Sequence, residues 1–210
     1  MYAVRLMRLE DIPQVNEIDK EAYSDPWSPS KYKRDLILSR FACYFVAWDD
    51  AEPSKPAEEA TTQGGFLWRM RHLLSKEEVA PSSNQHILGF AGMWFIVGEA
   101  HLTTIAVRET YRRRGIGELL LISAIELSIM RGWNMVTLEV REFNTPAQAL
   151  YEKYGFKRVG VRRGYYTNNG EDAILMSTEN ITSAPFQAHF QGLKEEHTRR
   201  WGKAHLALGQ

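Results

Sequence analysis

Three arginines and two glycines between a predicted strand and a predicted helix are the sharpest chemical feature of the sequence. The first turn of a helix leaves backbone N–H groups unpaired and carries a partial positive charge. Glycine lets a ligand come close to the backbone, and arginine adds positive charge. This combination favours a pyrophosphate site, although a solvated basic turn would have the same residues. The segment consists of Arg112, Arg113, Arg114, Gly115, Ile116, Gly117 and Glu118.

A carboxylate, a phenol and an amide lie further along the chain, and each has an ordinary structural explanation. Glu139 stands in a mostly apolar predicted strand, where its burial is unfavourable unless it is paired. An ion pair with Arg141 or exposure at the strand end would account for it. Tyr151 lies on the apolar face of a predicted helix, where core packing is the usual role. Asn144 precedes Thr-Pro at a predicted helix start, where Asn or Thr caps the helix.

Alternating strand and helix patterns surround these residues. Hydrophobic periodicity and turn residues predict strands at 4–7, 41–48, 86–97, 100–107, 135–140, 156–165 and 173–177. Helices are predicted to start at residue 8, at Pro29, at Gly115 and at Thr145. Strands that alternate with helices and also form antiparallel hairpins are typical of an α/β fold with a mixed sheet covered by helices.

Two segments depart from this pattern. Residues 49–63 are crowded with Ala, Glu, Pro, Ser, Lys and Thr, which predicts a flexible insertion at 49–85 between the second and third strands. Residues 182–210 form a polar, weakly patterned tail. A helix is predicted there from Leu193 to Leu208, weakened by Gly202. We therefore expect one domain at 1–181 followed by a C-terminal tail.

Composition excludes several classes of protein. The 210 residues contain 26 Lys and Arg and 26 Asp and Glu, which argues against a strongly basic nucleic-acid-binding protein. The single cysteine, Cys43, excludes a disulfide scaffold and a cysteine-based zinc cluster. The longest nearly apolar run, 87–97, is about half the roughly 20 residues needed to cross a bilayer. No export signal is recognisable, so we expect a cytoplasmic protein with no metal, no membrane contact and no direct nucleic-acid binding.

The motifs together resemble those of a known enzyme family. Arg112-x-x-Gly115-x-Gly117 after Ile105-Ala106-Val107 is similar to the acetyl-CoA signature of the GCN5-related N-acetyltransferases (GNAT). The segments at 26–28, 138–144, 149–156, 162–166 and 170–176 resemble the RimI branch, whose members acetylate the N-terminal alanine of a small-subunit ribosomal protein. The resemblance covers residues 3–181 except the insertion.

This resemblance implies a fold and a cosubstrate. The GNAT fold has a mixed central sheet of about seven strands, flanked by about four helices, with two central strands splayed apart. The cosubstrate is acetyl-CoA, whose pantetheine arm would lie between the splayed strands and bind the backbone of Ile105, Ala106 and Val107. Its pyrophosphate would bind the amides of residues 113–118, and Asn144 would also contact it.

The resemblance also implies catalytic roles. Glu139 would be the general base and Tyr151 the general acid for the departing thiolate, because a phenol with a pKa of about 10 stays protonated at neutral pH. A strand amide, that of Val107, would stabilise the developing oxyanion. Trp27, Tyr165 and Tyr166 would line the peptide entrance, although surface aromatics would show the same pattern.

Amine chemistry favours a protein N-terminus as the acceptor. An α-amine with a pKa of 7.7–8.0 is roughly one-tenth neutral at pH 7, whereas about one lysine in 2,500 is neutral, a gap of about 3.4 kcal/mol. We therefore predict acetylation of a protein N-terminus, with the N-terminal alanine of a ribosomal protein as the leading substrate. The alternatives are a broader N-terminal or small-amine acetyltransferase and a non-catalytic acetyl-CoA-binding module. The sequence leaves the oligomeric state open.

Overall fold

The computed structural model describes residues 1–53, 84–96 and 98–208. Most of the predicted insertion at 49–85 therefore lies outside the described residues. The strands are β1 (Tyr2–Leu6), β2 (Ala42–Pro53), β3 (Gln85–Ile96), β4 (Glu99–Val107), β5 (Val136–Arg141), β6 (Phe156–Tyr166), β7 (Glu171–Thr178) and β8 (His205–Ala207). The α-helices are α1 (Ile12–Ala22), α2 (Pro29–Leu38), α4 (Ile116–Met130), α5 (Thr145–Lys153) and α6 (Ala184–Trp201). Short 3-10 helices lie at Leu9–Asp11 and Glu109–Tyr111.

The strands form one mixed sheet in the order β6-β7-β5-β4-β3-β2-β1-β8. The β4–β5 and β1–β8 pairs are parallel, and the other neighbours are antiparallel. The predicted α/β fold with a mixed central sheet is confirmed. The described part of the chain has eight strands and five α-helices, one more of each than the approximate counts expected from the resemblance.

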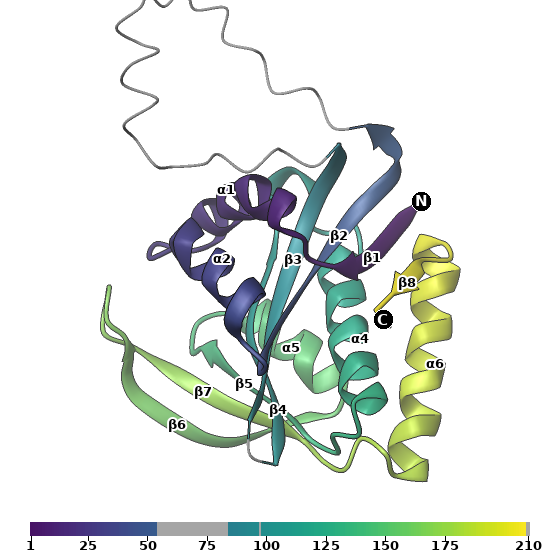
Figure 1. Cartoon of the computed structure of the whole chain (residues 1–210). Helices are drawn as coiled ribbons and strands as arrows, with labels where there is room; N and C mark the ends of the chain where they lie inside the picture. The colour runs from purple at the N-terminus through teal and green to yellow at the C-terminus, as the bar shows by residue number, and fades with distance from the viewer. Residues whose placement is uncertain (54–83, 97, 209–210) are drawn as a thin grey trace, which may run out of the picture.

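Two cores form because alternate residues of a strand face opposite sides of the sheet. In β2, Tyr44 and Val46 pack with residues of α1 and α2, whereas Phe45 and Ala47 belong to the core that includes α4. Helices α1 and α2 therefore lie across the sheet from α4 (Figure 1).

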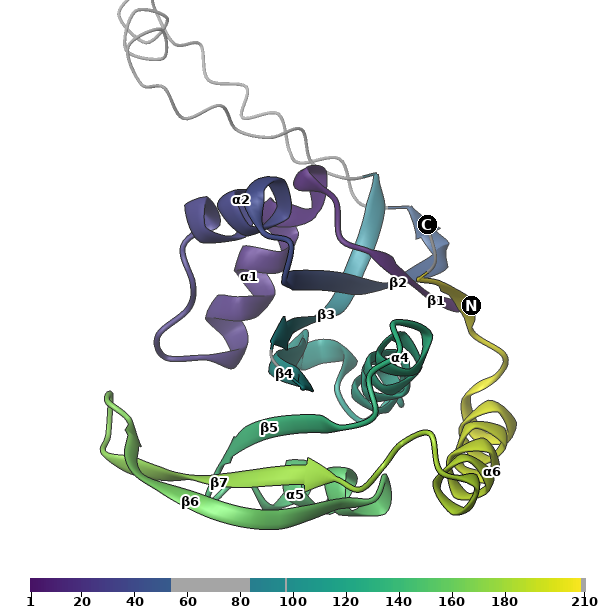
Figure 2. The same cartoon turned by 60° about the horizontal axis from the view of Figure 1, so that its bottom comes forward.

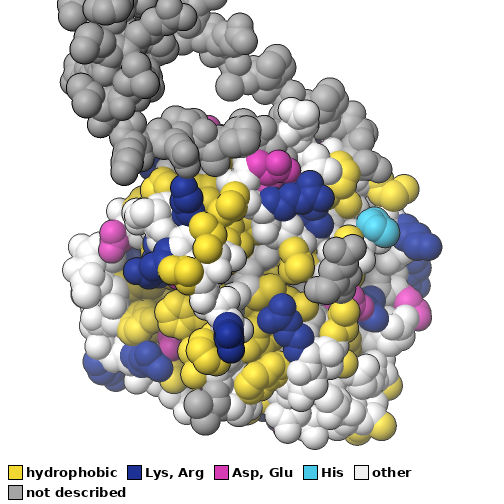
Figure 3. Space-filling model, in the orientation of Figure 1, with side chains coloured by type: hydrophobic (Ala, Val, Ile, Leu, Met, Phe, Trp, Pro, Cys, Tyr) yellow, Lys and Arg dark blue, Asp and Glu magenta, His cyan; other side chains and the backbone are white. Residues whose placement is uncertain are grey.

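On the face seen in Figure 3, Lys and Arg side chains are scattered among apolar ones.

The C-terminal segment is more ordered than the sequence pattern indicated. Helix α6 begins at Ala184 rather than Leu193, so the predicted helix start was wrong. The early part of the helix packs through aromatic side chains, which the predicted pattern did not include. Phe186 and Phe190 lie one turn apart and stack with a centroid distance of 6.0 Å. Gly202, at φ +88°, ends the helix, and β8 then pairs with β1. A three-residue strand has almost no local signal, because it is stabilised by its partner strand.

The β4–β5 ladder stops early, and this parting confirms the predicted splay. The two strands pair only at Ala100–Val136, His101–Thr137 and Leu102–Leu138. Figure 2 shows β5, β6 and β7 turning away from the rest of the sheet. Arg108 N–H bonds to the Leu88 carbonyl, so the alternation of an antiparallel ladder points the backbone N–H and C=O groups of Ile105 and Val107 away from β3 and towards the gap.

Candidate active site

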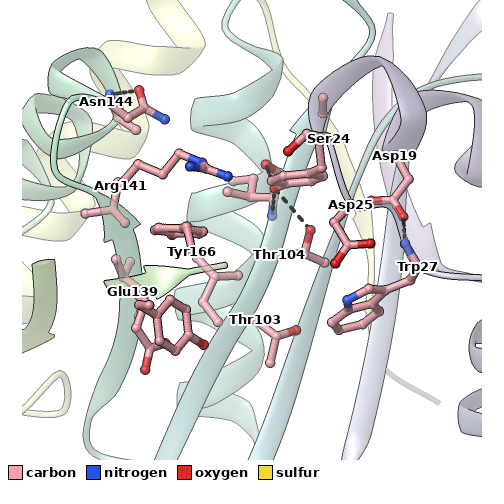
Figure 4. A pocket seen from close by; sticks show the side chains of 18 of the residues that line it. Asp19, Ser24, Asp25, Trp27, Thr103, Thr104, Glu139, Arg141, Asn144 and Tyr166 are labelled. Atoms are coloured by element: carbon pink, nitrogen blue, oxygen red, sulfur yellow. Dashed lines mark hydrogen bonds between the residues drawn. The ribbon is translucent and has the colours of Figure 1, made fainter. Parts of the chain in front are cut away.

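A cleft of about 530 Å³ lies where β4 and β5 part. Figure 4 shows its two walls, with Glu139 and Arg141 on one side, Asp25 and Trp27 on the other, and Thr104 of β4 between them. The cleft brings together seven of the residues predicted from sequence: Trp27, Ile105, Glu139, Asn144, Tyr151, Tyr165 and Tyr166. It does not include the other predicted cofactor contacts, Ala106, Val107 and residues 112–118.

Glu139 is buried and paired, but not with the partner considered from sequence. Its side chain is 8% exposed, with Oε2 2.9 Å from Nε2 of His101 and Oε1 3.1 Å from a terminal nitrogen of Arg162. Arg141 instead forms an ion pair of 2.7 Å with Glu171. The carboxylate therefore has a partner on each oxygen and still lines the cleft.

The environment of Glu139 keeps it ionised. Burial raises the pKa of its carboxyl group, and this is the largest single effect. The hydrogen bond from His101 and the nearby charges of His101 and Arg162 together outweigh burial, so the pKa lies below its ordinary value. At neutral pH, Glu139 is thus a carboxylate able to accept a proton.

Tyr151 faces the cleft from α5 and also packs in the core. It is 5% exposed, and its ring lies 5.7 Å from that of Phe156. Burial raises the pKa of its phenol, with smaller contributions from Tyr23 and Tyr166. Within residues 1–53, 84–96 and 98–208, nothing forms a hydrogen bond with the Tyr151 hydroxyl. The hydroxyl is thus protonated at neutral pH and lies beside the cleft.

Asn144 caps α5, as the sequence indicated. Its side-chain oxygen accepts a hydrogen bond of 3.3 Å from the Ala147 N–H. The residue is exposed and lines the cleft, so capping leaves its amide nitrogen available to a ligand.

Tyr23, which sequence analysis missed, binds the β4 edge inside the cleft. Its hydroxyl donates to the Ile105 carbonyl at 2.8 Å and accepts from the Ile105 N–H at 3.3 Å and from Thr104 Oγ1 at 3.1 Å. The Ile105 backbone, predicted to bind the pantetheine arm, therefore has a protein partner here. Tyr23 follows the last turn of α1, and no local pattern connects that position with a strand so distant in sequence.

The peptide-entrance residues lie on opposite sides of the cleft. Tyr165 and Tyr166 stack edge to face on β6, with a centroid distance of 5.2 Å. Trp27 follows α1, and its backbone N–H donates to Asp19 Oδ2 at 2.7 Å. The two walls are joined by a hydrogen bond of 2.6 Å from the Asn168 side chain to Ser24 Oγ.

The start of α4 offers unpaired amides beside exposed cations. In the part of the chain that the structure describes, no group accepts a hydrogen bond from the N–H groups of residues 113–118. The side chains of residues 112–114 are exposed. A Cβ placed on Gly117 would meet only Val107 Cγ2, at 3.7 Å, so space is open there. The Glu118 side chain is already bound to Lys153 and Tyr154.

Helix α6 covers the other glycine of this segment. Gly115 has φ +76°, and a Cβ there would lie 2.6 Å from the Trp201 ring. His197 Nε2 lies 3.0 Å from the Gly115 carbonyl oxygen. Of the two glycines, therefore, only Gly117 has open space above it.

Two features are absent from residues 1–53, 84–96 and 98–208. No set of three His, Cys, Asp or Glu side chains in these ranges is arranged to hold a metal ion. No helix in the same ranges is long and apolar enough to span a membrane.

Sequence comparison establishes the class of protein that this fold and cleft define. The chain belongs to the acetyltransferase (GNAT) family, whose family model matches residues 43–156. It is accordingly an acetyl-CoA-dependent N-acetyltransferase.

Individual relatives confirm the resemblance to the RimI branch. The chain is 41% identical over 179 residues to the ribosomal protein bS18-alanine N-acetyltransferase of Escherichia coli K12, covering 84% of this chain and 97% of that one. It is 48% identical over 178 residues to an N-alpha-acetyltransferase of Saccharolobus solfataricus, covering 84% and 92%. The crystal structure of the ribosomal-protein-S18-alanine N-acetyltransferase from Escherichia coli matches with a TM-score of 0.64 and 26% identity, covering 88% and 97%.

Proposed function

We propose that this enzyme acetylates the N-terminal α-amine of a protein, with the N-terminal alanine of a small-subunit ribosomal protein as the leading substrate. The observation that carries the proposal is the pairing, in one cleft, of the ionised Glu139 with the protonated Tyr151 at the point where β4 and β5 part. Relatives whose names specify this reaction support it. The proposal takes residues 1–181 as the catalytic domain and the cytoplasm, where ribosomal proteins are made, as its location.

The residues at the start of α4 fit the diphosphate of acetyl-CoA. Unpaired amides at residues 113–118 and the open space at Gly117 suit close approach of an anion, and the exposed arginines add positive charge. Asn144 would provide a further contact from α5. Of the predicted strand contacts, the Val107 N–H faces the gap and its carbonyl accepts from Arg112 Nε at 3.4 Å, whereas Ile105 would exchange its Tyr23 partner for the ligand.

Each catalytic side chain handles one proton. Acetyl-CoA supplies an acetyl group activated as a thioester. Glu139 takes a proton from the attacking nitrogen, as the new N–C bond forms. Tyr151 gives its hydroxyl proton to the sulfur, as the C–S bond breaks. The Val107 N–H is assigned as the donor that would stabilise the developing oxyanion.

The pKa of Glu139 favours an α-amine over lysine. A carboxylate whose pKa lies below its ordinary value is a weak base. Deprotonating lysine at pH 7 requires about 3.4 kcal/mol more than deprotonating an α-amine. The acceptor that matches this base is therefore the group that is already partly neutral.

The decisive experiment compares two forms of one peptide. The full chain is incubated with acetyl-CoA and a peptide that has an N-terminal alanine and an internal lysine, either with a free N-terminus or with that end blocked. Mass spectrometry should find one acetyl group, on the α-amine of the free peptide only. Acetylation of lysine in both forms would overturn the proposed acceptor. Binding of acetyl-CoA without transfer to any amine tested would favour the non-catalytic alternative.

The pyrophosphate site is tested by Gly117→Val. The Cβ of a side chain there would meet only Val107 Cγ2, at 3.7 Å, but the side chain occupies the space through which a phosphate must approach the amides. Hydrogen bonds to charged groups contribute about 1.5–3 kcal/mol, so we expect acetyl-CoA affinity, measured by titration calorimetry, to fall about tenfold to a hundredfold. Gly192→Val is the matched control, because Gly192 also lies in a helix, and an added Cβ there would meet nothing within 4 Å. Equal affinity in both variants would refute the site.

A further inference from the structure

His101 contacts the Glu139 carboxylate directly. The resemblance to the GNAT family implies no role for this histidine. Its Nε2 lies 2.9 Å from Glu139 Oε2, and its Nδ1 lies 2.9 Å from Thr137 Oγ1. Both His101 and Glu139 line the cleft. The flanking residues Ala100 and Leu102 point into the core that includes α4, so His101 lies on the opposite face of β4, with Thr137 and Glu139 beside it on β5.

The position of His101 in the sheet explains why such a contact is needed. The β4–β5 ladder ends at Leu102–Leu138, so Glu139 is the first residue of β5 without a partner on β4. The bond from His101 reaches across the start of the gap and ties the carboxylate to β4. This contact orients Glu139 where the two backbones no longer hold each other.

We infer that His101 is a positioning residue for acetyl transfer: its Nε2–H donates to Glu139 and keeps that carboxylate ionised and fixed beside the cleft. An ionised carboxylate only accepts hydrogen bonds, so the proton between the two atoms belongs to Nε2. The Thr137 hydroxyl serves either form of the ring, because it donates to a bare Nδ1 and accepts from a protonated one. The bond to Glu139 is therefore kept whether or not the imidazole is charged.

Arg162 is the weaker of the two partners of Glu139. Its side chain comes from β6 and is 53% exposed, whereas that of His101 is 21% exposed. Solvent screens an exposed ion pair more strongly than a buried one. The remaining titratable groups near the carboxylate are Tyr165 and Tyr166, also on β6, and both are uncharged at neutral pH. His101 is thus the principal group that opposes the effect of burial on Glu139.

Removing the His101 donor should raise the pKa of the Glu139 carboxyl group. Burial alone raises the pKa of Glu139, and the His101 contact lowers it. In His101→Leu the balance moves towards burial, so the carboxyl group takes up a proton at higher pH and loses its ability to act as a base there. In His101→Gln, the amide N–H replaces the imidazole donor and should restore much of the effect.

The test is a pH titration of the free, full-length enzyme, followed by ¹³C NMR of the Glu139 side-chain carboxyl. We expect the midpoint in His101→Leu to lie about one pH unit or more above that of the wild type, a tenfold change in proton affinity, and in His101→Gln to lie between the two. The acid limb of kcat should move in the same direction. His205→Leu, an exposed histidine in β8, should leave both curves unchanged.

The inference rests on the proposed role of Glu139 as the base. Different outcomes would overturn the role of Glu139 and the role of His101. If Glu139→Gln retained full activity, the proposed base would be wrong, whatever the NMR midpoint. If Glu139→Gln were inactive but His101→Leu had a wild-type midpoint and acid limb, only the positioning role would be overturned. A loss of activity in His101→Leu that Gln does not rescue, with an unmoved midpoint and a lower Tm, would likewise reduce His101 to a structural residue.

Discussion

Glutamine in place of Glu139 should lower the rate of acetyl transfer by about 10²–10⁴-fold at neutral pH. The amide has the shape of the carboxylate but cannot take a proton from the attacking amine. Solvent then has to remove that proton, so the residual rate should rise by up to about tenfold per pH unit until the α-amine is about half neutral near pH 8. Steady-state kinetics between pH 6 and 9 on the alanine peptide measure both effects.

The matched control for this variant is Glu142→Gln. Glu142 lies in the segment that connects β5 to α5, and its side chain is exposed and outside the cleft. It should keep the wild-type rate, and both variants should have a Tm close to that of the wild type. A Glu139→Gln enzyme with a near-normal rate and an unchanged pH profile would remove the residue from the mechanism.

Phenylalanine in place of Tyr151 should give a loss in the same range, about 10²–10⁴-fold. The change removes one hydroxyl and keeps the ring that packs on Phe156. Since that hydroxyl has no hydrogen-bond partner among the residues the structure describes, its loss leaves no protein group unsatisfied. The fold should therefore be intact, and the defect should appear in kcat rather than in the affinity for acetyl-CoA.

A thioester with a better leaving group distinguishes this role. If Tyr151 protonates the departing sulfur, an acetyl thioester of lower thiol pKa should recover part of the lost rate in Tyr151→Phe but not in Glu139→Gln. Tyr2→Phe, in β1 and away from the cleft, controls for the loss of a phenol and should behave as wild type. Equal losses with both thioesters would contradict the role as an acid.

Much of the fold was accessible from sequence because local rules agree with tertiary packing. Gly132 follows α4, Gly155 follows α5 and Gly170 lies in the turn between β6 and β7, and all three have positive φ, which glycine adopts without strain. The C-terminal segment was less predictable. The buried face of α6 packs into the core that includes α4, where Phe190 lies against Tyr154 at the end of α5, and β8 is a strand because β1 lies beside it.

Some residues of the site were likewise predictable from sequence, and others were not. Family-like motifs identified Glu139 and Tyr151, and the structure places both on one cleft. The partners that set their chemistry were not predictable, because they come from elements distant in sequence. His101 reaches Glu139 through a parallel ladder, and Tyr23 reaches Ile105 through the packing of α1 on β4. Neither contact has a periodicity or spacing that a single sequence displays.

The short ladder between β4 and β5 also means that a ligand bound in the gap would stabilise the fold. Only three register pairs join these strands, so the native sheet is incomplete at its centre. A ligand that fills the gap binds the folded chain and not the unfolded one, and at a free concentration one hundred times its Kd it adds about 2.7 kcal/mol to the free energy of unfolding. A cell rich in acetyl-CoA would therefore hold this enzyme in a form that resists heat and proteases, and starvation would make the same chain easier to degrade.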